Sequence, residues 1–513
     1  MIIVPESASR LKGFVKESGL RGVAAMMLLR MAIMFTSAGR RASCSAAAGA
    51  IASESVHRGE VSRHLAKPRW MEQDHNFRLR MALLGKESKR GTFLFIIDAT
   101  LASQAGKKTE NTYSTGNRGR HRAKRRRYGQ KKVVYKKCHS FTFGLLICPS
   151  GIRIPFEIPH FTKEYCEAYG HDHRTTAEAA ADMILSLPLP ANAKVVVLGD
   201  TAYDAEVIHK ACEKRGYTWI FPANPERVYE GPKGQRPKLR SRLKDWEHLS
   251  PKRIRLRMST GKYASLRRLS KWRMGPKQKP RDYFAYQEIR EVRSVGRVQL
   301  VFSTMKPKLT QATPDDVKIL MTNAVDLDVR EVIELYSLRW QIELFFKELK
   351  STLGFAQYSF QRFAAVHAWV ETAITTVLYL EDQRMQRMRD HRLSKKQRDW
   401  WATQRLHGLC AAFRQECQRG GRCAARHRVQ LQIVGVAPDV AGILVQALHV
   451  VPELGAHQRV PHQPLGHLVE DVAVQHDRQG QQQGVTAQPH QDVRAQAAMA
   501  RHASLASCGT ASR

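Results

Sequence analysis

The 513-residue sequence is poor in acidic side chains relative to basic ones. Asp and Glu total 46 against 84 Lys and Arg, which gives a formal net charge of +38 at pH 7. This excess is far larger than solubility requires, so it indicates a polyanionic partner. Nucleic acid is the simplest such partner, and an anionic membrane surface is the alternative.

The sequence also lacks a long hydrophobic run and paired cysteines. The best candidate for a membrane span, Val23–Phe35, has only 13 residues and contains Arg30, whereas a spanning helix needs about 20 apolar residues. This stretch begins too far along the chain to be a signal peptide. The 9 cysteines form no Cys-x-x-Cys pair, which fits a reducing compartment. We therefore expect a cytoplasmic protein with no membrane partner.

Lysine, tryptophan and phenylalanine disappear toward the C-terminus, where the last of each is Lys396, Trp401 and Phe413. From Gly420 onward the sequence contains 13 Gln and 8 His. Such a segment has few aromatic side chains to bury. We predict that residues 396–513 are a C-terminal tail without a function of its own, partly disordered or translated out of frame.

Between these ends, short apolar runs predict a mixed sheet. Thr92–Ile97 and Lys194–Leu198 are typical of buried strands. Further strands are predicted at Val133–Ile147, Ile152–Ile158 and Tyr217–Pro222, and helices at Thr175–Leu187 and Tyr203–Arg215. The resulting order, β-β-β-α-β-α-β, predicts an α/β fold with helices flanking the sheet.

These patterns divide the chain into five regions. Residues 1–90 are predicted to be helical, either as a helix-turn-helix that grips a DNA end or as a helical lid. Residues 91–222 and 326–395 form the two parts of the α/β core. Residues 223–325 are an all-β insertion between them, with strands at Arg281–Val292, Arg297–Ser303 and Lys318–Thr322. Residues 396–513 are the tail.

The stretch Tyr336–Lys350 has the clearest helical pattern in the chain. At 100° per residue, Tyr336, Arg339, Glu343 and Lys350 share one stripe about 60° wide. An apolar face beside it can dock the helix on a core, and a third sector is expected to face solvent. The apolar face comprises Leu335, Leu338, Ile342, Phe345, Phe346 and Leu349, and the solvent sector comprises Glu334, Ser337, Gln341 and Glu348. Taken alone, the stripe also fits a surface helix with an Arg339–Glu343 ion pair.

A dense basic segment, Asn117–Lys132, includes Arg125, Arg126 and Arg127. Because no apolar periodicity allows it to fold alone, we predict a loop that becomes ordered on DNA phosphates. A nonspecific basic segment is the alternative.

Three carboxylates stand at chemically useful places. Asp98 follows the first buried strand, Asp200 follows the strand at 194–198, and Glu343 lies on the docked helix. Clustered carboxylate oxygens are the ligands that two-metal phosphoryl transfer requires. Asp98 could instead only cap the turn after it. If the fold joins them, the three carboxylates are of the right type to hold two divalent ions.

The spacing Tyr336-x2-Arg339-x3-Glu343-x6-Lys350 resembles the Tyr-Arg-Glu-Lys signature of bacterial insertion-sequence transposases of the DDE class. Asp98 in Ile-Ile-Asp-Ala-Thr resembles their first catalytic Asp, and Asp200 with Tyr203 resembles their Asp-x-x-Tyr motif. The resemblance covers about residues 90–380. It implies an RNase H-like core in a bacterial, nucleoid-associated protein, acting as a homodimer on element ends and target DNA.

The resemblance further implies that Asp98, Asp200 and Glu343 are catalytic and bind two Mg²⁺ ions, for which Mn²⁺ can substitute. It also implies that Tyr336, Arg339 and Lys350 contact the DNA backbone. The implied reaction nicks the element's ends and joins their 3′ hydroxyls to target DNA. The strand at 317–323 lacks the aromatic residue that hairpin-forming relatives carry before the Glu helix, which argues against a hairpin intermediate. Two alternatives remain: a degenerate copy that represses transposition by binding element ends, and a metal-dependent nuclease.

Overall fold

The computed structural model describes the greater part of the chain up to residue 416. The described residues are 5–38, 42–51, 56–88, 90–104, 106, 108–116, 135–244, 249–256, 262–263, 265–266, 281–306 and 316–416. The chain divides into two compact units, Met1–Val450 and Val451–Arg513, and every described residue belongs to the first. The basic segment Asn117–Lys132 and the tail beyond residue 416 lie outside the described residues.

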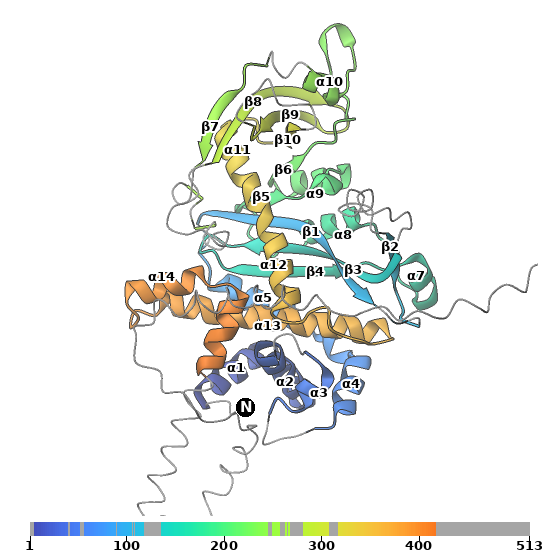
Figure 1. Ribbon diagram of the computed structural model, residues 1–513, viewed down its shortest axis with the longest axis vertical. Coiled ribbons are helices and arrows are strands. Elements are labelled where there is room, and N and C mark those ends of the chain that lie inside the picture. Colours follow the sequence, from blue (N-terminus) through green and yellow to red (C-terminus); the bar gives the residue numbers. More distant parts are fainter. Residues whose placement is uncertain are drawn as a thin grey trace, which may run out of the picture. The chain divides into compact units, whose positions relative to one another are not determined.

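One mixed sheet dominates the described part of the chain (Figure 1). Its strand order is β2-β3-β1-β5-β6-β10-β9-β8-β7, and β4 pairs with β3 beside β2. The strands are β1 (Thr92–Gln104), β2 (Tyr113–Gly116), β3 (Tyr135–Ile147), β4 (Arg153–Pro159), β5 (Lys194–Leu198), β6 (Thr218–Pro222), β7 (Lys252–Leu256), β8 (Arg281–Val292), β9 (Gly296–Thr304) and β10 (Lys318–Thr322). The predicted mixed α/β class is thus confirmed.

The first strand, β1, forms the middle of the core. It pairs antiparallel with β3 and parallel with β5, and its residues 94–97 are fully buried. Gly144 of β3 allows this packing, because a Cβ there would lie 2.1 Å from Cζ of Phe95. A side chain at this position would therefore push the two strands apart.

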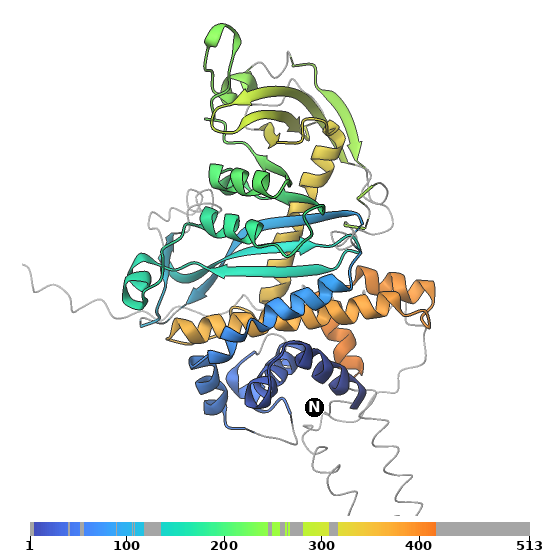
Figure 2. The same cartoon turned by 180° about the vertical axis from the view of Figure 1, so that it is seen from behind.

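Helices cover both faces of the sheet, with α12 crossing one face (Figure 1) and α8 and α9 lying on the other (Figure 2). After β4 come α7 (Lys163–Tyr169), α8 (Thr176–Leu185) and α9 (Glu206–Lys214). After β10 come α11 (Val329–Tyr336), α12 (Trp340–Ser351), α13 (Phe363–Arg389) and α14 (Lys395–Thr403). A capping box starts α8, with Thr175 and Glu178 bonding each other's backbone N–H.

The N-terminal region is helical, as the sequence predicts. It contains α1 (Pro5–Glu17), α2 (Gly22–Ala38), α3 (Cys44–Ala48), α4 (Arg58–Ala66) and α5 (His75–Gly85). Helices α2, α4 and α5 pack against the long helix α13. Helix α13 is long and apolar enough to cross a membrane, but 83% of its most apolar window is buried inside the protein. Length and composition alone therefore do not make it a membrane span.

Several local predictions need correction. Strand β1 does not end at Ile97 but runs to Gln104, because β3 continues to pair with it as far as Lys137. The predicted helix Tyr203–Arg215 begins only at Glu206, and α7 was not predicted. The insertion is not all-β, because it contains α10 (Leu239–Lys244). Its strands also extend the core sheet through the pairing of β10 with β6.

The start of the predicted tail is folded. Helix α14 begins at Lys395, and a further helical segment spans residues 406–416. Leu406, Leu409, Cys410 and Phe413 from this segment are buried in the core. The boundary of the folded unit therefore lies beyond residue 396.

Candidate active site

Strand register brings the two predicted aspartates to the same place. Ile96 of β1 is the parallel partner of Leu198 of β5, and each Asp lies two residues further along its chain segment. Strand β5 ends there, while β1 continues. Because neighbouring strands lie about 4.8 Å apart, Asp98 and Asp200 face each other across the point where the parallel pair opens. Asp98 therefore lies level with the end of the neighbouring strand β5, whereas its own strand β1 continues beyond it.

Asp200 also caps the short 3₁₀ turn Thr201–Tyr203, since its Oδ1 accepts a hydrogen bond of 2.9 Å from the N–H of Ala202. The turn places Tyr203 in the interior, where it is 3% exposed. The Tyr203 hydroxyl has no hydrogen-bond partner among the described residues. Burial raises the pKa of Tyr203, and the nearby charges of Asp98 and Asp200 raise it further. An unpaired hydroxyl therefore lies beside the two aspartates.

The predicted helix is present, but it is not uniform. Helix α11 leads through a 3₁₀ turn, Ser337–Arg339, into α12. Because these three residues turn by 120° each instead of 100°, α11 is rotated by about 60° relative to α12. With this rotation Arg339 lies at the same angle as Tyr336 and Glu343 lies about 40° from them, so the polar residues still share one stripe. The six residues of the predicted apolar face are buried, as expected.

The predicted solvent sector of this helix is wrong for three of its four residues, since Glu334, Gln341 and Glu348 are buried. Gln341 is 3% exposed, and its amide donates a 2.8 Å hydrogen bond to the carbonyl of Leu266. Glu348 is 9% exposed and accepts a 3.2 Å bond from Nη1 of Arg153. Arg153 also bonds Glu381 of α13 at 3.0 Å. These buried polar contacts clamp α12 between β4 and α13.

Arg339 joins two of the carboxylates. Its Nη2 donates a 2.5 Å hydrogen bond to Oε1 of Glu343, and its Nη1 lies 3.6 Å from Oδ2 of Asp98. The fold therefore brings Asp98 and Glu343 to the two sides of one guanidinium group, although they are far apart in the sequence. The geometry reproduces the predicted Arg339–Glu343 pair and adds a contact with the carboxylate of β1.

The electrostatics of Asp98 reflect this crowding. The pKa of Asp98 is raised from 3.8 to about 6, chiefly by burial. The negative charges of Asp200 and Glu343 contribute to this rise, whereas the Ala99 N–H and Arg339 oppose it. Like charges that disfavour ionisation are typical of a site that binds cations.

Tyr336 lies in the same neighbourhood. Burial raises its pKa to about 12, with Arg339 opposing and Asp200 and Glu343 adding to the shift. Lys318 of β10 was missed by sequence reasoning, although its ammonium lies 5.2 Å from the centre of the Tyr336 ring. Burial lowers the pKa of Lys318, Arg339 lowers it further and Glu343 raises it. The sequence alone does not identify Lys318 as a site residue, because a lysine at the start of a strand has no distinctive pattern. Its position near Tyr336 follows only from the place of β10 in the sheet.

The position of Lys350 differs from that of the other predicted DNA contacts. Its ammonium donates a 2.7 Å hydrogen bond to the carbonyl of Leu101, three residues beyond Asp98 on β1. Burial lowers its pKa. Lys350 thus braces α12 against β1 instead of meeting Arg339. The other predicted DNA contacts, Arg125, Arg126 and Arg127, lie outside the described residues.

A cavity of about 400 Å³ opens beside Arg339. Tyr336, Lys318, Trp340 and Tyr283 contribute to its lining, together with other residues of β8–β10 and α11. Trp340 is 52% exposed, although it is one of the largest apolar side chains of α12. The cavity therefore combines aromatic surface with positive charge next to the carboxylates.

The donor set suits hard divalent cations, since it consists of carboxylate oxygens alone. Two ions about 4 Å apart need ligands spread over such a distance. Asp98 lies near Asp200 through the register of β1 and β5, and it shares the guanidinium of Arg339 with Glu343.

Comparison with known proteins gives one positive finding. Residues 166–379 match the family model described as "Transposase DDE domain". The match includes Asp200, the Tyr336–Lys350 helix and the insertion, but it begins after Asp98. No curated protein matches the chain. The match covers less than half of the chain, and it supports a likeness of this part to DDE transposases.

Proposed function

We propose that this protein is a DDE transposase that cuts the ends of an insertion sequence and joins their 3′ hydroxyls to target DNA. The observation that carries the proposal is the single guanidinium of Arg339 between Asp98 and Glu343, with Asp200 in register beside Asp98. Elements distant in the sequence thereby supply three carboxylates and one fixed positive charge to one location. This combination suits a phosphodiester and its metal ions.

In this proposal Asp98, Asp200 and Glu343 hold two Mg²⁺ ions, which activate the attacking oxygen and stabilise the leaving oxygen when bound. Arg339 compensates the carboxylates before the metal arrives. When the ions take over this role, its guanidinium is free to bind a phosphate. Tyr336 and Lys318 border the adjacent cavity and contact the DNA strand that enters it.

Charge supports the same substrate as the site does. A formal charge of +38 favours binding along extended DNA. The segment with Arg125, Arg126 and Arg127 adds phosphate contacts in this proposal. Two protomers, each with one site, would hold the two element ends in a synaptic homodimer. The strand before the Glu helix has no aromatic residue, which favours strand joining without a hairpin.

Excision from a plasmid that carries the gene's own flanking DNA tests the proposal. The parent protein should excise and join the element in Mg²⁺ but not in chelator. Glu343→Gln should bind the ends and excise nothing, because it keeps the shape but removes a metal-binding charge. Glu213→Gln, at an exposed position on α9, is the matched control and should retain activity.

Other outcomes would contradict the proposal in distinguishable ways. Cleavage without any joined product would indicate a nuclease. End binding without cleavage by the parent would indicate a repressor. Equal excision by Glu343→Gln would show that the metal assignment is wrong.

A further inference from the structure

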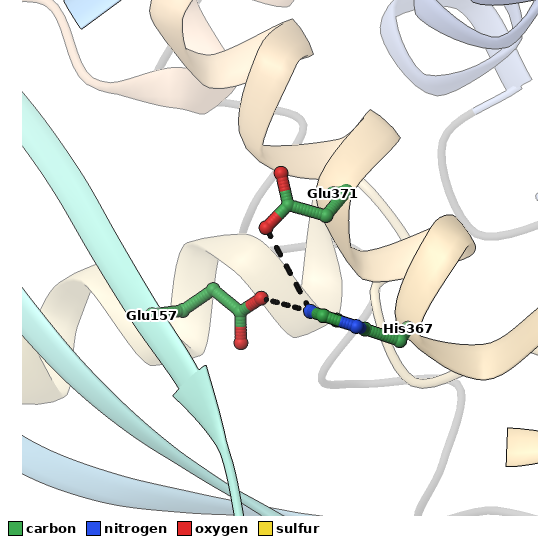
Figure 3. A group of neighbouring side chains, drawn as sticks. All are labelled: Glu157, His367 and Glu371. Atoms are coloured by element: carbon green, nitrogen blue, oxygen red, sulfur yellow. Dashed lines mark hydrogen bonds and ion pairs between the residues drawn. The ribbon is translucent and has the colours of Figure 1, made fainter. Parts of the chain in front are cut away.

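A second cluster of metal-ligand side chains lies between β4 and α13. Glu157 belongs to β4, while His367 and Glu371 lie one turn apart on α13 (Figure 3). Nε2 of His367 is 2.9 Å from Oε1 of Glu157 and 3.8 Å from Oε1 of Glu371. All three ligand atoms lie within 4.8 Å of one another. The mechanism proposed above does not use any of them.

The spacing fits a small divalent transition-metal ion. A tetrahedral zinc site with bonds of about 2.0–2.1 Å places its ligand atoms roughly 3.3 Å apart. The two measured separations, 2.9 and 3.8 Å, lie on either side of that value. The third separation is at most 4.8 Å. Closure around an ion therefore requires the ligand atoms to approach one another by no more than about 1.5 Å.

Glu157 provides an independent observation that points to a bound cation. Its side chain is 0% exposed. Its second oxygen, Oε2, has no hydrogen-bond partner in the described part of the chain. A buried carboxylate oxygen without a donor is costly unless a cation compensates it. The oxygen is available to complete the coordination of an ion held by the other ligands.

The surroundings also resemble a prepared ligand shell. Asn76 of α5 donates its side-chain N–H to Oε2 of Glu371 and to the Glu371 carbonyl. Oε1 of Glu371 is thereby directed at His367. Metal-bound carboxylates are commonly oriented by such hydrogen bonds from neighbouring side chains. His367 is 27% exposed, so an ion can enter from solvent.

Arg80 is a permanent cation near the two carboxylates, since its charge acts on both Glu157 and Glu371. Its Nη2 has no hydrogen-bond partner among the described residues.

We propose that Glu157, His367 and Glu371 form a structural binding site for Zn²⁺. An imidazole nitrogen with two carboxylates selects zinc-like ions over Mg²⁺, which prefers oxygen alone. The ion fastens α13 to β4, and through Asn76 it also fastens α5, so the N-terminal helices are joined to the sheet. The inference stands apart from the proposed catalytic function, because the two sites share no residue.

Zinc binding by the full-length, chelator-treated protein tests this inference. The Glu343→Gln form serves as the background, so that ions at the catalytic carboxylates do not obscure the result. Titration with Zn²⁺ is monitored by calorimetry and thermal unfolding, and Co²⁺ supplies a visible spectrum that reports coordination. We expect one Zn²⁺ per chain that is lost in His367→Asn and in Glu371→Gln. Asn76→Ala should weaken binding about tenfold.

His391→Asn is the matched control, since His391 is exposed in the turn after α13. It should bind Zn²⁺ like the parent. Circular dichroism establishes that each variant is folded, and Glu371→Gln decides the question if His367→Asn does not fold. No Zn²⁺ uptake by the folded parent would overturn the inference. Equal Zn²⁺ uptake by the parent and by Glu371→Gln would also overturn the inference. The three side chains would then form only a buried hydrogen-bond network without a metal ion.

Discussion

Replacement of Asp98 by Asn should stabilise the metal-free protein while it abolishes cleavage. In the folded protein the pKa of Asp98 is raised from 3.8 to about 6. A raised carboxyl pKa adds stability that is complete below pH 3.8 and is lost as the pH rises through 6. Asn cannot ionise, so the variant escapes this loss.

The magnitude can be worked from the shift. About two pH units at 1.36 kcal/mol each set a ceiling near 3 kcal/mol for the gain at pH 8. Solvent reaches Asp98, whose side chain is 19% exposed, and screening reduces the expected gain to about 1–2 kcal/mol. At roughly 2–4 °C for each kcal/mol, this corresponds to an increase in Tm of about 2–8 °C.

Thermal unfolding in chelator between pH 4 and pH 8 measures the effect. The Tm of Asp98→Asn minus that of the parent should be near zero at pH 4 and should grow through pH 6. Asp326→Asn, at an exposed site, is the control and should show no such trend. A Tm of Asp98→Asn at or below that of the parent at pH 8 would refute the idea that crowding at Asp98 destabilises the site. Mg²⁺ should raise the Tm of the parent alone.

Two further predictions concern arginines. Arg339→Ala removes a cation that lowers the pKa of Asp98, so the acidic limb of the cleavage pH profile should move to higher pH; an unchanged midpoint would contradict this electrostatic role. Arg153→Met leaves two buried glutamates without one of their partners, and its free energy of unfolding should fall by about 3 kcal/mol in urea titrations. Arg174→Met, in an exposed ion pair, should change the free energy of unfolding by less than about 1 kcal/mol.

The buried strands could be predicted from sequence with little error. Lys194–Leu198, Arg281–Val292 and Lys318–Thr322 coincide with β5, β8 and β10. Each is bounded by glycine, proline or charge and contains enough β-branched or aromatic residues to identify it. The second half of β1 has no such signal, because Ala99–Gln104 is small and polar. Only its partner β3 explains why it remains a strand.

Long-range partners also explain the failures around the candidate site. Helical periodicity placed Gln341 and Glu348 in solvent, since polar residues usually mark the exposed face. Leu266 and Arg153, which bury them, lie at distant positions in the sequence. The same holds for Lys350, whose partner Leu101 comes from β1. The sequence shows which side chains are charged or polar, but only the fold shows which partner each of them contacts.

The continuity of the sheet from β6 into β10 has a consequence for any attempt to shorten the protein. Strand β6 hydrogen-bonds β5 on one side and β10 on the other. Deletion of residues 223–325 would leave the second side of β6 as a bare edge of apolar residues, Trp219, Ile220 and Phe221. Such edges recruit strands from other molecules and lead to aggregation. A minimal version of this protein must therefore keep β10 or replace it with a strand that closes the same edge.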